Sequence, residues 1–467
     1  MSAASFQVPQ ASSSSHNWSS LSTATSQIKF TSQMTISRTL SDVAKIALPA
    51  TNTGISVAAI AMAFVAFIVN RWRATAWRHP TLVVSGGSRI RQIVERCPRL
   101  HKPFRPPLLA FHTLAQLALH AFFHENKRAD TGKHARFNRE IRKLDDGGEV
   151  GFDWLDDSSF NNKDVTPPPP PLPDTAPLLV CLHTITGGSH DFAGAAMLAR
   201  TRGFRVVVFL RRGHIDRPLA TPRFNLLGCV HDLHAQLVHV RSQYPQASHV
   251  ACLSSSAGTG LSVRYCGEKR DACLIDALVC TCPGYDTTEG GAFARMQPML
   301  GSYLLRGVRK LFLEPNVSIL KDVKGFQACH EDVDNMADFQ RNAYQLEGFD
   351  SLESYHDATN PMGVASDISV PTLVINAEDD PVCAKSNVMD HVHLFSSEDN
   401  NANRALALTR WGAHCCYFEG DWLLPRGYRW CDEVAVEFLL ESCRTTNLPP
   451  REGVAREQQH PVSSSVL

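Results

Sequence analysis

The feature that most constrains the fold is a run of three serines between two segments of different character. Val250–Leu253 is a short apolar run that predicts a buried strand, and the residues after Gly258 have the pattern of a helix. Ser254, Ser255 and Ser256 lie between these two segments. A serine at a sharp strand-to-helix turn, with small residues two positions to either side, is typical of a nucleophile elbow. Because Ser254 and Gly258 flank Ser256 in this way, Ser256 is the predicted nucleophile.

A serine-rich turn also caps helices without any catalytic role, so the elbow needs partners further along the chain. In the fold class that uses this elbow, the nucleophile is followed along the chain by an acid and then by a histidine. A predicted strand over Pro371–Asn376 is followed by the acids Asp379 and Asp380, and a second over Ala405–Leu408 leads to His414. Taken alone, each is an acidic turn or one surface histidine among 20. Together, in this order and at strand ends, they predict a catalytic triad.

A further predicted strand, Pro177–Leu182, precedes a candidate oxyanion loop. The loop has the sequence HTITGG over residues 183–188. A loop in this position donates one backbone N–H to the oxyanion, and the residue after the nucleophile donates the other. The predicted donors are therefore the N–H groups of Ile185 and Ala257. A Gly-Gly loop can also bind phosphate, but the Lys-Ser/Thr pair of a P-loop does not follow it.

Several widely spaced segments resemble those of one protein family. The segment LHTITGGS at residues 182–189 is similar to LPGLTGGS of that family. The other similar segments, each with the family's motif in brackets, are Asp146–Trp154 (DGG…LDW), Arg211–Arg223 (RG…TPR), Ala337–Tyr355 (the helical stretch before the acid strand), Ala377–Pro381 (NAxDDP) and Gly412–His414 (GGH). From about residue 100 to about residue 440 the chain resembles family 4 of the α/β-hydrolase superfamily. That family contains membrane-anchored abhydrolase-domain phospholipases and related esterases.

The resemblance implies an α/β-hydrolase fold, a mostly parallel central sheet with helices on both faces and a helical cap. The alternation of predicted strands and helices independently favours such a sheet. By position in the family motifs, Ser256 is the nucleophile, His414 the base and Asp380 the acid, since the family's acid directly precedes the proline. No metal and no organic cofactor is implied. Thr184 and Ser254 stand at glycine positions of the family, and we expect Thr184 to reshape the oxyanion hole.

An apolar run near the N-terminus predicts a membrane anchor over residues 47–70. This segment contains Ile55–Val69 and reaches roughly the 20 residues that a bilayer requires. Arg71 and Arg73 follow it and favour a cytosolic position for the rest of the chain. The 14 cysteines, several of them in predicted core strands, agree with a reducing compartment. The prediction is a single-pass membrane protein with a cytosolic catalytic domain, in an organelle that the sequence does not specify.

Amino-acid composition predicts how the chain outside the anchor is divided into segments. The predicted parts are a disordered Ser/Thr-rich segment 1–46, a hydrolase domain 71–443 with a proline-rich insertion 161–176 and a cap region 284–365, and a disordered tail 444–467. The prolines of Pro167–Pro173 form a stiff spacer to which an SH3-type partner could dock, although the favoured interpretation is a solvated surface insertion. A formal net charge of zero gives no electrostatic reason to expect nucleic acid as a partner.

These observations predict a carboxylic-ester hydrolase of the lipase, phospholipase or esterase type. It would be tethered to a membrane and would hydrolyse or transfer the acyl chains of lipid esters such as phospholipids or acylglycerols. The lipid substrate is implied by the family resemblance and the predicted anchor, whereas the triad alone predicts only acyl chemistry. The alternative is a catalytically weak or inactive scaffold that uses the same fold and binds partners through its proline-rich segment.

Overall fold

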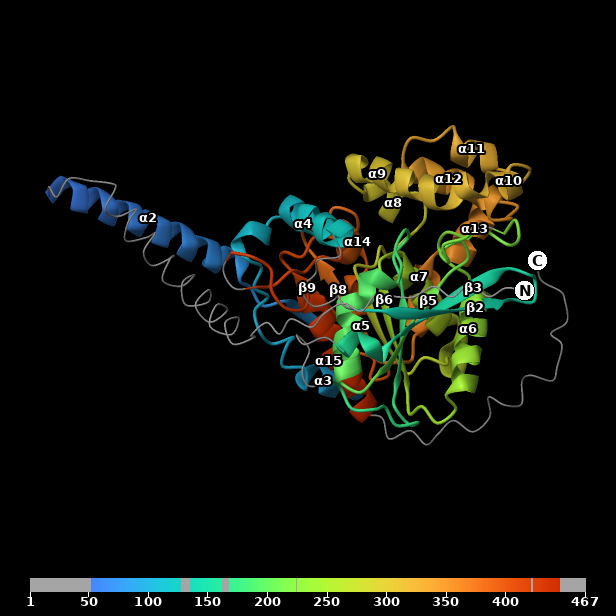
Figure 1. The fold of residues 1–467 in the computed structure, drawn as a ribbon, viewed down its shortest axis with the longest axis horizontal. Helices are drawn as coiled ribbons and strands as arrows, with labels where there is room; N and C mark the ends of the chain where they lie inside the picture. Colours follow the sequence, from blue (N-terminus) through green and yellow to red (C-terminus); the bar gives the residue numbers. More distant parts are fainter. Residues whose placement is uncertain (1–51, 127–134, 162–167, 224, 421–422, 446–467) are drawn as a thin grey trace, which may run out of the picture. The chain divides into compact units, whose positions relative to one another are not determined.

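The computed structural model describes residues 52–126, 135–161, 168–223, 225–420 and 423–445 (Figure 1). The chain divides into two compact units, 1–71 and 72–467. The predicted disordered segment 1–46 lies outside the described residues, as do residues 446–467 of the predicted tail.

The predicted single-pass anchor over residues 47–70 is wrong. Residues 47–51 lie outside the described part of the chain, and helix α2 runs from Asn52 to Ala76. Among the described residues, no helix combines the length and the apolar character needed to cross a membrane. The run Ile55–Val69 has about 15 residues and, at about 1.5 Å of rise per residue, extends about 22 Å, whereas a hydrocarbon core is about 30 Å thick.

The second unit is built around a nine-stranded sheet with the order β1-β9-β8-β7-β6-β4-β5-β3-β2. The strands are β1 (Thr81–Val84), β2 (Phe137–Lys143), β3 (Glu149–Leu155), β4 (Leu178–Leu182), β5 (Arg205–Leu210), β6 (Val250–Ser255), β7 (Ala277–Thr281), β8 (Thr372–Ala377) and β9 (Arg404–Thr409). Strands β4 to β9 are mutually parallel. At one edge β1 pairs antiparallel with β9, and at the other edge β3 pairs antiparallel with both β5 and β2. The predicted α/β-hydrolase fold is confirmed.

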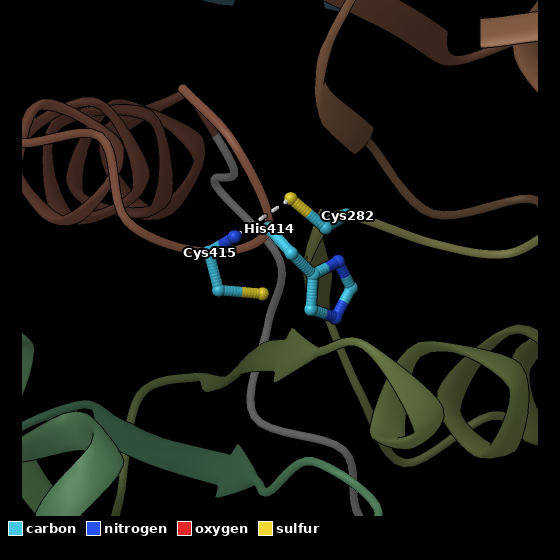
Figure 2. A group of neighbouring side chains, drawn as sticks. All are labelled: Cys282, His414 and Cys415. Atoms are coloured by element: carbon cyan, nitrogen blue, oxygen red, sulfur yellow. Dashed lines mark hydrogen bonds between the residues drawn. The ribbon is translucent and has the colours of Figure 1, made fainter. Parts of the chain in front are cut away.

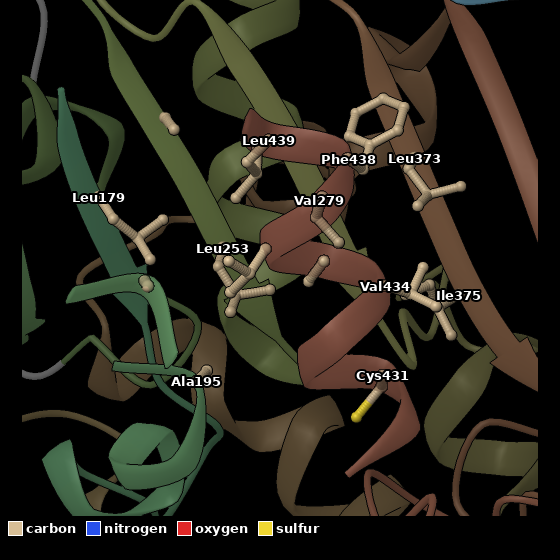
Figure 3. Close-up of a cluster of buried hydrophobic side chains, with 14 of the residues drawn as sticks. Leu179, Ala195, Leu253, Val279, Leu373, Ile375, Cys431, Val434, Phe438 and Leu439 are labelled. Atoms are coloured by element: carbon tan, nitrogen blue, oxygen red, sulfur yellow. The ribbon is translucent and has the colours of Figure 1, made fainter. Parts of the chain in front are cut away.

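Helices cover both faces of this sheet because the parallel strands are apolar on both sides. The described helices of the second unit are α3 (Ser88–Glu95), α4 (Thr113–Asn126), α5 (Ala193–Thr201), α6 (Val230–Gln243), α7 (Ala257–Lys269), α14 (Lys385–Asp390) and α15 (Trp430–Arg444), together with six helices between β7 and β8. On one face, Val434 and Phe438 of α15 pack against Leu253 and Val279 of the strands (Figure 3). On the other face, Leu237 of α6 and neighbouring residues of α7 form a second buried cluster.

The chain between β7 and β8 folds into a separate group of helices. These are α8 (Ala292–Arg295), α9 (Pro298–Val308), α10 (Val317–Leu320), α11 (Phe326–His330), α12 (Met336–Leu346) and α13 (Leu352–Thr359). Figure 1 shows α8 to α12 as one group apart from the helices that flank the sheet. Their own core includes Leu305, Phe312 and Phe339, and it continues onto Ile185 of the β4–α5 loop. These helices lie within the region 284–365 that was predicted to form a cap.

Candidate active site

Ser256 lies at the turn between β6 and α7, in a backbone conformation that few residues other than glycine adopt. Its φ is 50° and its ψ is −119°, and its N–H donates to the carbonyl of Thr281 at 2.9 Å. Such strained geometry is found where a serine is held exposed at the end of a strand. Two residues later, a Cβ on Gly258 would overlap the carbonyl oxygen of Leu182, so only glycine fits. The helix and β4 can therefore approach each other closely behind Ser256.

Ser254, at a glycine position of the resembled family, fits its site without strain. Its side chain is fully buried, and its Oγ lies 2.8 Å from the Oγ of Ser262 and donates to the carbonyl of Val279 at 3.1 Å. Burying a hydroxyl is tolerated when its hydrogen bonds are made. The hydrogen bonds behind the elbow therefore accommodate serine where the family has glycine.

The structure brings Ser256, His414 and Asp380 into one chain of hydrogen bonds. Nε2 of His414 lies 2.9 Å from the Oγ of Ser256. On the other side of the ring, Nδ1 lies 2.9 Å from Oδ2 and 3.2 Å from Oδ1 of Asp380. The three residues come from the ends of β6, β8 and β9, three strands whose carboxyl ends share one edge of the sheet.

The two adjacent aspartates point to different partners. Asp380 is buried and accepts the backbone N–H groups of Val382 and Cys383 at 2.8 Å each, which fixes its carboxylate toward His414. Asp379 instead accepts the hydroxyl of Thr113 at 2.7 Å and the N–H of Ala413 at 2.9 Å. Burial raises the pKa of Asp379 to about 6. Asp380 therefore faces the imidazole, and Asp379 ties down the loop that carries it.

The charge on His414 is governed by its carboxylate neighbour. Burial alone lowers the pKa of this imidazole, but the carboxylate of Asp380 outweighs burial and, with the nearby thiol groups, holds the pKa well above its ordinary value. On either side of His414, Ala413 and Cys415 have φ values of 48° and 61°. A ring held between two strained residues and a buried carboxylate has little freedom to turn.

The predicted oxyanion loop is held from behind by side chains that follow β5. Arg211 is buried, and it donates to the carbonyl of Thr184 at 2.7 Å and to that of His183 at 3.3 Å. Nε2 of His214 lies 3.1 Å from the carbonyl of Ile185. Burial, followed by the charge of Arg211, lowers the pKa of His214 to about 3, so this ring is neutral and can donate. Three successive carbonyls of the loop are therefore turned toward β5.

Thr184, which stands at a glycine position of the resembled family, does not adopt a backbone conformation that requires glycine. It is absent from the described residues with positive φ, and its hydroxyl donates to Oδ2 of Asp191 at 3.3 Å. The same carboxylate accepts the N–H of Gly188 at 3.2 Å. At Gly187 a Cβ would overlap this carboxylate. The threonine is thus part of a hydrogen-bonded turn, and its hydroxyl is already engaged with Asp191.

An apolar cavity opens beside Ser256. It encloses about 710 Å³ of empty space, part of it open to solvent, and Ile185, Ser256 and Ala257 lie together in its wall. Its apolar lining includes Phe293, Met296 and Leu304 of the cap region, together with Leu227, Val263 and Met362. A cavity with this apolar lining suits the hydrocarbon part of a ligand.

Sequence reasoning missed the side chains that support the loops. Arg211 was noted only as part of a family motif, and His214 and Thr113 were not identified. One signal was present, because Arg211 and His214 follow directly after an apolar strand, and polar residues at the carboxyl ends of parallel strands gather at one edge of the sheet. For Thr113, on a helix far away in sequence, no such signal exists.

Known proteins resemble this chain over most of its length. Residues 175–421, more than half of the chain, match the Hydrolase_4 family described as "Serine aminopeptidase, S33". Phospholipase ABHD3 of Mus musculus is 26% identical over 380 residues, covering 78% of this chain and 84% of the relative. Monoacylglycerol lipase ABHD2 of Mus musculus is 23% identical over 418 residues, covering 85% and 93%.

Among solved structures, a bacterial membrane phospholipase A described as a virulence factor is 14% identical, with a TM-score of 0.38 over 65% of this chain and 86% of its own. The family assignment rests on the match over residues 175–421 and agrees with the observed sheet order. The chain belongs to the serine aminopeptidase S33 family of α/β-hydrolases.

Proposed function

We propose that this chain is a serine hydrolase that cleaves lipid esters, with Ser256 as nucleophile, His414 as base and Asp380 as acid. The observation that carries the proposal is the continuous hydrogen-bonded chain from Asp380 through His414 to Ser256, at the wall of an apolar cavity. In the described part of the chain, this geometry meets the requirement that nucleophile, base and orienting acid lie within hydrogen-bonding distance.

The reaction follows from these contacts. Nε2 of His414 takes the proton of the Ser256 hydroxyl as the oxygen attacks the ester carbonyl. Asp380 holds the imidazole by Nδ1–H, which keeps Nε2 free to accept the proton, and its negative charge stabilises the imidazolium that forms. The imidazolium then protonates the departing alcohol. In the second half, His414 activates water, or another alcohol, to release the acyl group from Ser256.

The negative charge on the carbonyl oxygen needs donors fixed before the reaction begins. The backbone N–H groups of Ile185 and Ala257 are the proposed pair, because both residues line the cavity wall together with Ser256. Because Arg211 and His214 draw the carbonyls of residues 183–185 toward β5, they restrict the orientation of the peptide planes in the loop. We assign them as positioning residues for the oxyanion loop.

The lipid part of the proposal rests on two observations. The cavity lining is mainly apolar, which favours an acyl chain over a charged group. The relatives include a phospholipase and a monoacylglycerol lipase, each matched over most of its own length. Together these support ester substrates with long acyl chains and leave the head group open.

The proposal is tested with a fluorophosphonate probe and a series of esters. We expect the wild type to be labelled and the Ser256→Ala variant to remain unlabelled. We also expect kcat/KM to rise with acyl chain length for p-nitrophenyl esters, because a longer chain buries more apolar surface in the cavity. A folded wild-type protein that is neither labelled nor active on monoacylglycerol or phosphatidylcholine would contradict the proposal and leave the scaffold alternative.

A further inference from the structure

Two thiols lie directly beside the imidazole of His414. Cys282 follows the carboxyl end of β7, and Cys415 is the next residue after His414. The sulfur atoms of Cys282 and Cys415 and one ring nitrogen of His414 all lie within 4.8 Å of one another. Figure 2 shows the three side chains around one common space. The proposed triad does not use either thiol.

The backbone fixes the two cysteines on the same side of the histidine. Cys282 and Cys415 both have positive φ, 52° and 61°. The N–H of Cys415 donates to the sulfur of Cys282 at 3.3 Å, drawn as the dashed line in Figure 2. Cys282 is fully buried and Cys415 is 6% exposed. Such a pair is held in place before any ligand arrives, and the reachable side of the cluster is the side chain of His414, which is 15% exposed.

The three ligand atoms match the preferences of a borderline-soft metal ion. Two cysteine sulfurs and one histidine nitrogen form a recurring donor set for zinc, and none of the three residues is a carboxylate of the kind that calcium or magnesium requires. Tetrahedral zinc with bonds of about 2.0–2.3 Å places its ligand atoms about 3.5–3.8 Å apart. Because the ligand atoms lie within 4.8 Å of one another, the group needs to contract by at most roughly an ångström. Water would reach the fourth position from the exposed side of His414.

We propose that Cys282, His414 and Cys415 form a binding site for Zn²⁺ or another thiophilic divalent cation, and that occupation of this site inhibits the enzyme. Both ring nitrogens of His414 are already engaged, one with Ser256 and one with Asp380. The ion therefore takes the ring away from one of these partners. Binding forms two metal–sulfur bonds and one metal–nitrogen bond, releases the thiol protons to solvent, and breaks one of the two hydrogen bonds of the ring. The inhibitory effect rests on the proposed function, whereas the binding does not.

Binding is tested without any reference to catalysis. We expect Co²⁺ added to the reduced protein to give the near-ultraviolet charge-transfer band of cobalt–thiolate bonds, at one ion per chain, with displacement by Zn²⁺. The band should weaken in Cys282→Ser and in Cys415→Ser. The matched control is Cys229→Ser, which removes a half-buried thiol outside the cluster. A band that is absent from the wild type, or unchanged in both cluster variants, overturns the proposal.

Inhibition is tested on the same proteins with a p-nitrophenyl ester. We expect micromolar Zn²⁺ to abolish turnover reversibly, with recovery on addition of a chelator. The half-inhibitory concentration should rise at least about 10-fold in Cys282→Ser and Cys415→Ser, the lower end of what loss of even an outer-shell partner costs a metal site. Each variant is compared with its own metal-free rate. Equal sensitivity of the cluster variants and the wild type overturns the inhibitory role, even if cobalt binds.

A second group of potential ligands shares His414, and the two possible metal sites must be distinguished. Asp380, Cys383 and His414 also have ligand atoms within 4.8 Å of one another. If Cys383→Ser removes the cobalt–thiolate band while the cluster variants keep it, the assignment to Cys282 and Cys415 is overturned. Alanine at the same positions is the second set of variants, and thermal melting identifies those that remain folded. Lack of Ser256-dependent activity in a protein that still shows the cobalt band would contradict the proposed function and leave the metal site standing.

Discussion

The elbow after β6 and the oxyanion loop after β4 meet at the same cavity, but they are held in different ways. The backbone holds the elbow, since Ser256 has positive φ and Gly258 leaves no room for a Cβ against Leu182. Side chains from outside hold the loop, chiefly Arg211 and His214, which follow β5. A substitution within the elbow should therefore act directly, whereas the loop should depend more on its supports than on its own residues.

The largest effect is expected at the elbow itself. Ser256→Ala should lower kcat by about 10⁴-fold or more, because the nucleophile and the acyl-enzyme are lost. Ser255→Ala is the matched control, since its buried hydroxyl contacts the sulfur of Cys415 and not His414. Steady-state kinetics and fluorophosphonate labelling measure both variants. If Ser255→Ala were silent and Ser256→Ala active, the assigned register of the elbow would be incorrect.

The acid is expected to give the next largest effect. Asp380→Asn should lower kcat by about 10⁴-fold, because an amide at this position stabilises the wrong tautomer of His414. Asp379→Asn, one residue away, should retain most of the activity because its carboxylate contacts Thr113 and Ala413 instead. Steady-state measurement of kcat for both variants at the same pH tests this difference. Equal losses for the two variants would mean that the triad depends on the whole turn and not on one carboxylate.

The difference between the two regions also explains what the sequence could predict. The strands were readable because local apolar runs determine them: Val250–Leu253 is observed as Val250–Ser255, and Ala405–Leu408 as Arg404–Thr409. The positions predicted for the elbow and the triad from local pattern and chain order coincide with residues that the structure brings together. Local backbone preferences, together with the order of strands in a known fold, contain that information.

The supports of the loops could not be read in the same way. Arg211 contacts a loop that precedes it by more than 25 residues, and Thr113 contacts an aspartate 266 residues away. No periodic pattern in the sequence specifies which distant loop a polar side chain will contact. The predicted anchor failed for another reason. Counting weakly polar residues extended the apolar run Ile55–Val69 to 47–70, although its central apolar stretch is short for a bilayer.

The supports of the oxyanion loop should give an intermediate effect. Arg211→Lys removes the guanidinium that donates to two loop carbonyls, and we expect kcat to fall about 10–100-fold, less than the roughly 10²–10³-fold cost of losing an oxyanion donor outright. KM should change little, because the oxyanion forms only in the reaction. The control is Arg212→Lys, since Arg212 binds Asp232 and Asp146 and not the loop. We expect this control to lower the melting temperature and to leave kcat nearly unchanged. The reverse pattern would remove Arg211 from a positioning role.

Within the loop, a smaller effect is expected at the residue that departs from the family. Thr184→Gly should lower kcat by less than about 10-fold, since glycine loses the hydrogen bond to Asp191 and adds backbone freedom worth roughly 0.5–1 kcal/mol. Thr184→Val separates the two contributions, because it removes only the hydroxyl. A gain in kcat for the glycine variant would show that threonine displaces the loop in solution, and the loop would then resemble the elbow in depending on its own backbone.

Asp379 should give the smallest effect on turnover but a pH-dependent effect on stability. Its folded-state pKa of about 6 lies above the ordinary value of 3.8, so the folded protein holds this proton more tightly than the unfolded chain. The contribution of Asp379 to the free energy of unfolding is therefore fully present below about pH 4 and is lost as the pH rises through 6. The amide introduced by Asp379→Asn cannot ionise, so the free energy of unfolding of this variant relative to the wild type should rise over the same interval. At about 1.4 kcal/mol per pKa unit the gain is on the order of 2–3 kcal/mol. Urea denaturation at pH 4 and pH 8 measures it, and a difference that is the same at both pH values would mean that Asp379 holds the His414 loop in its charged form without penalty.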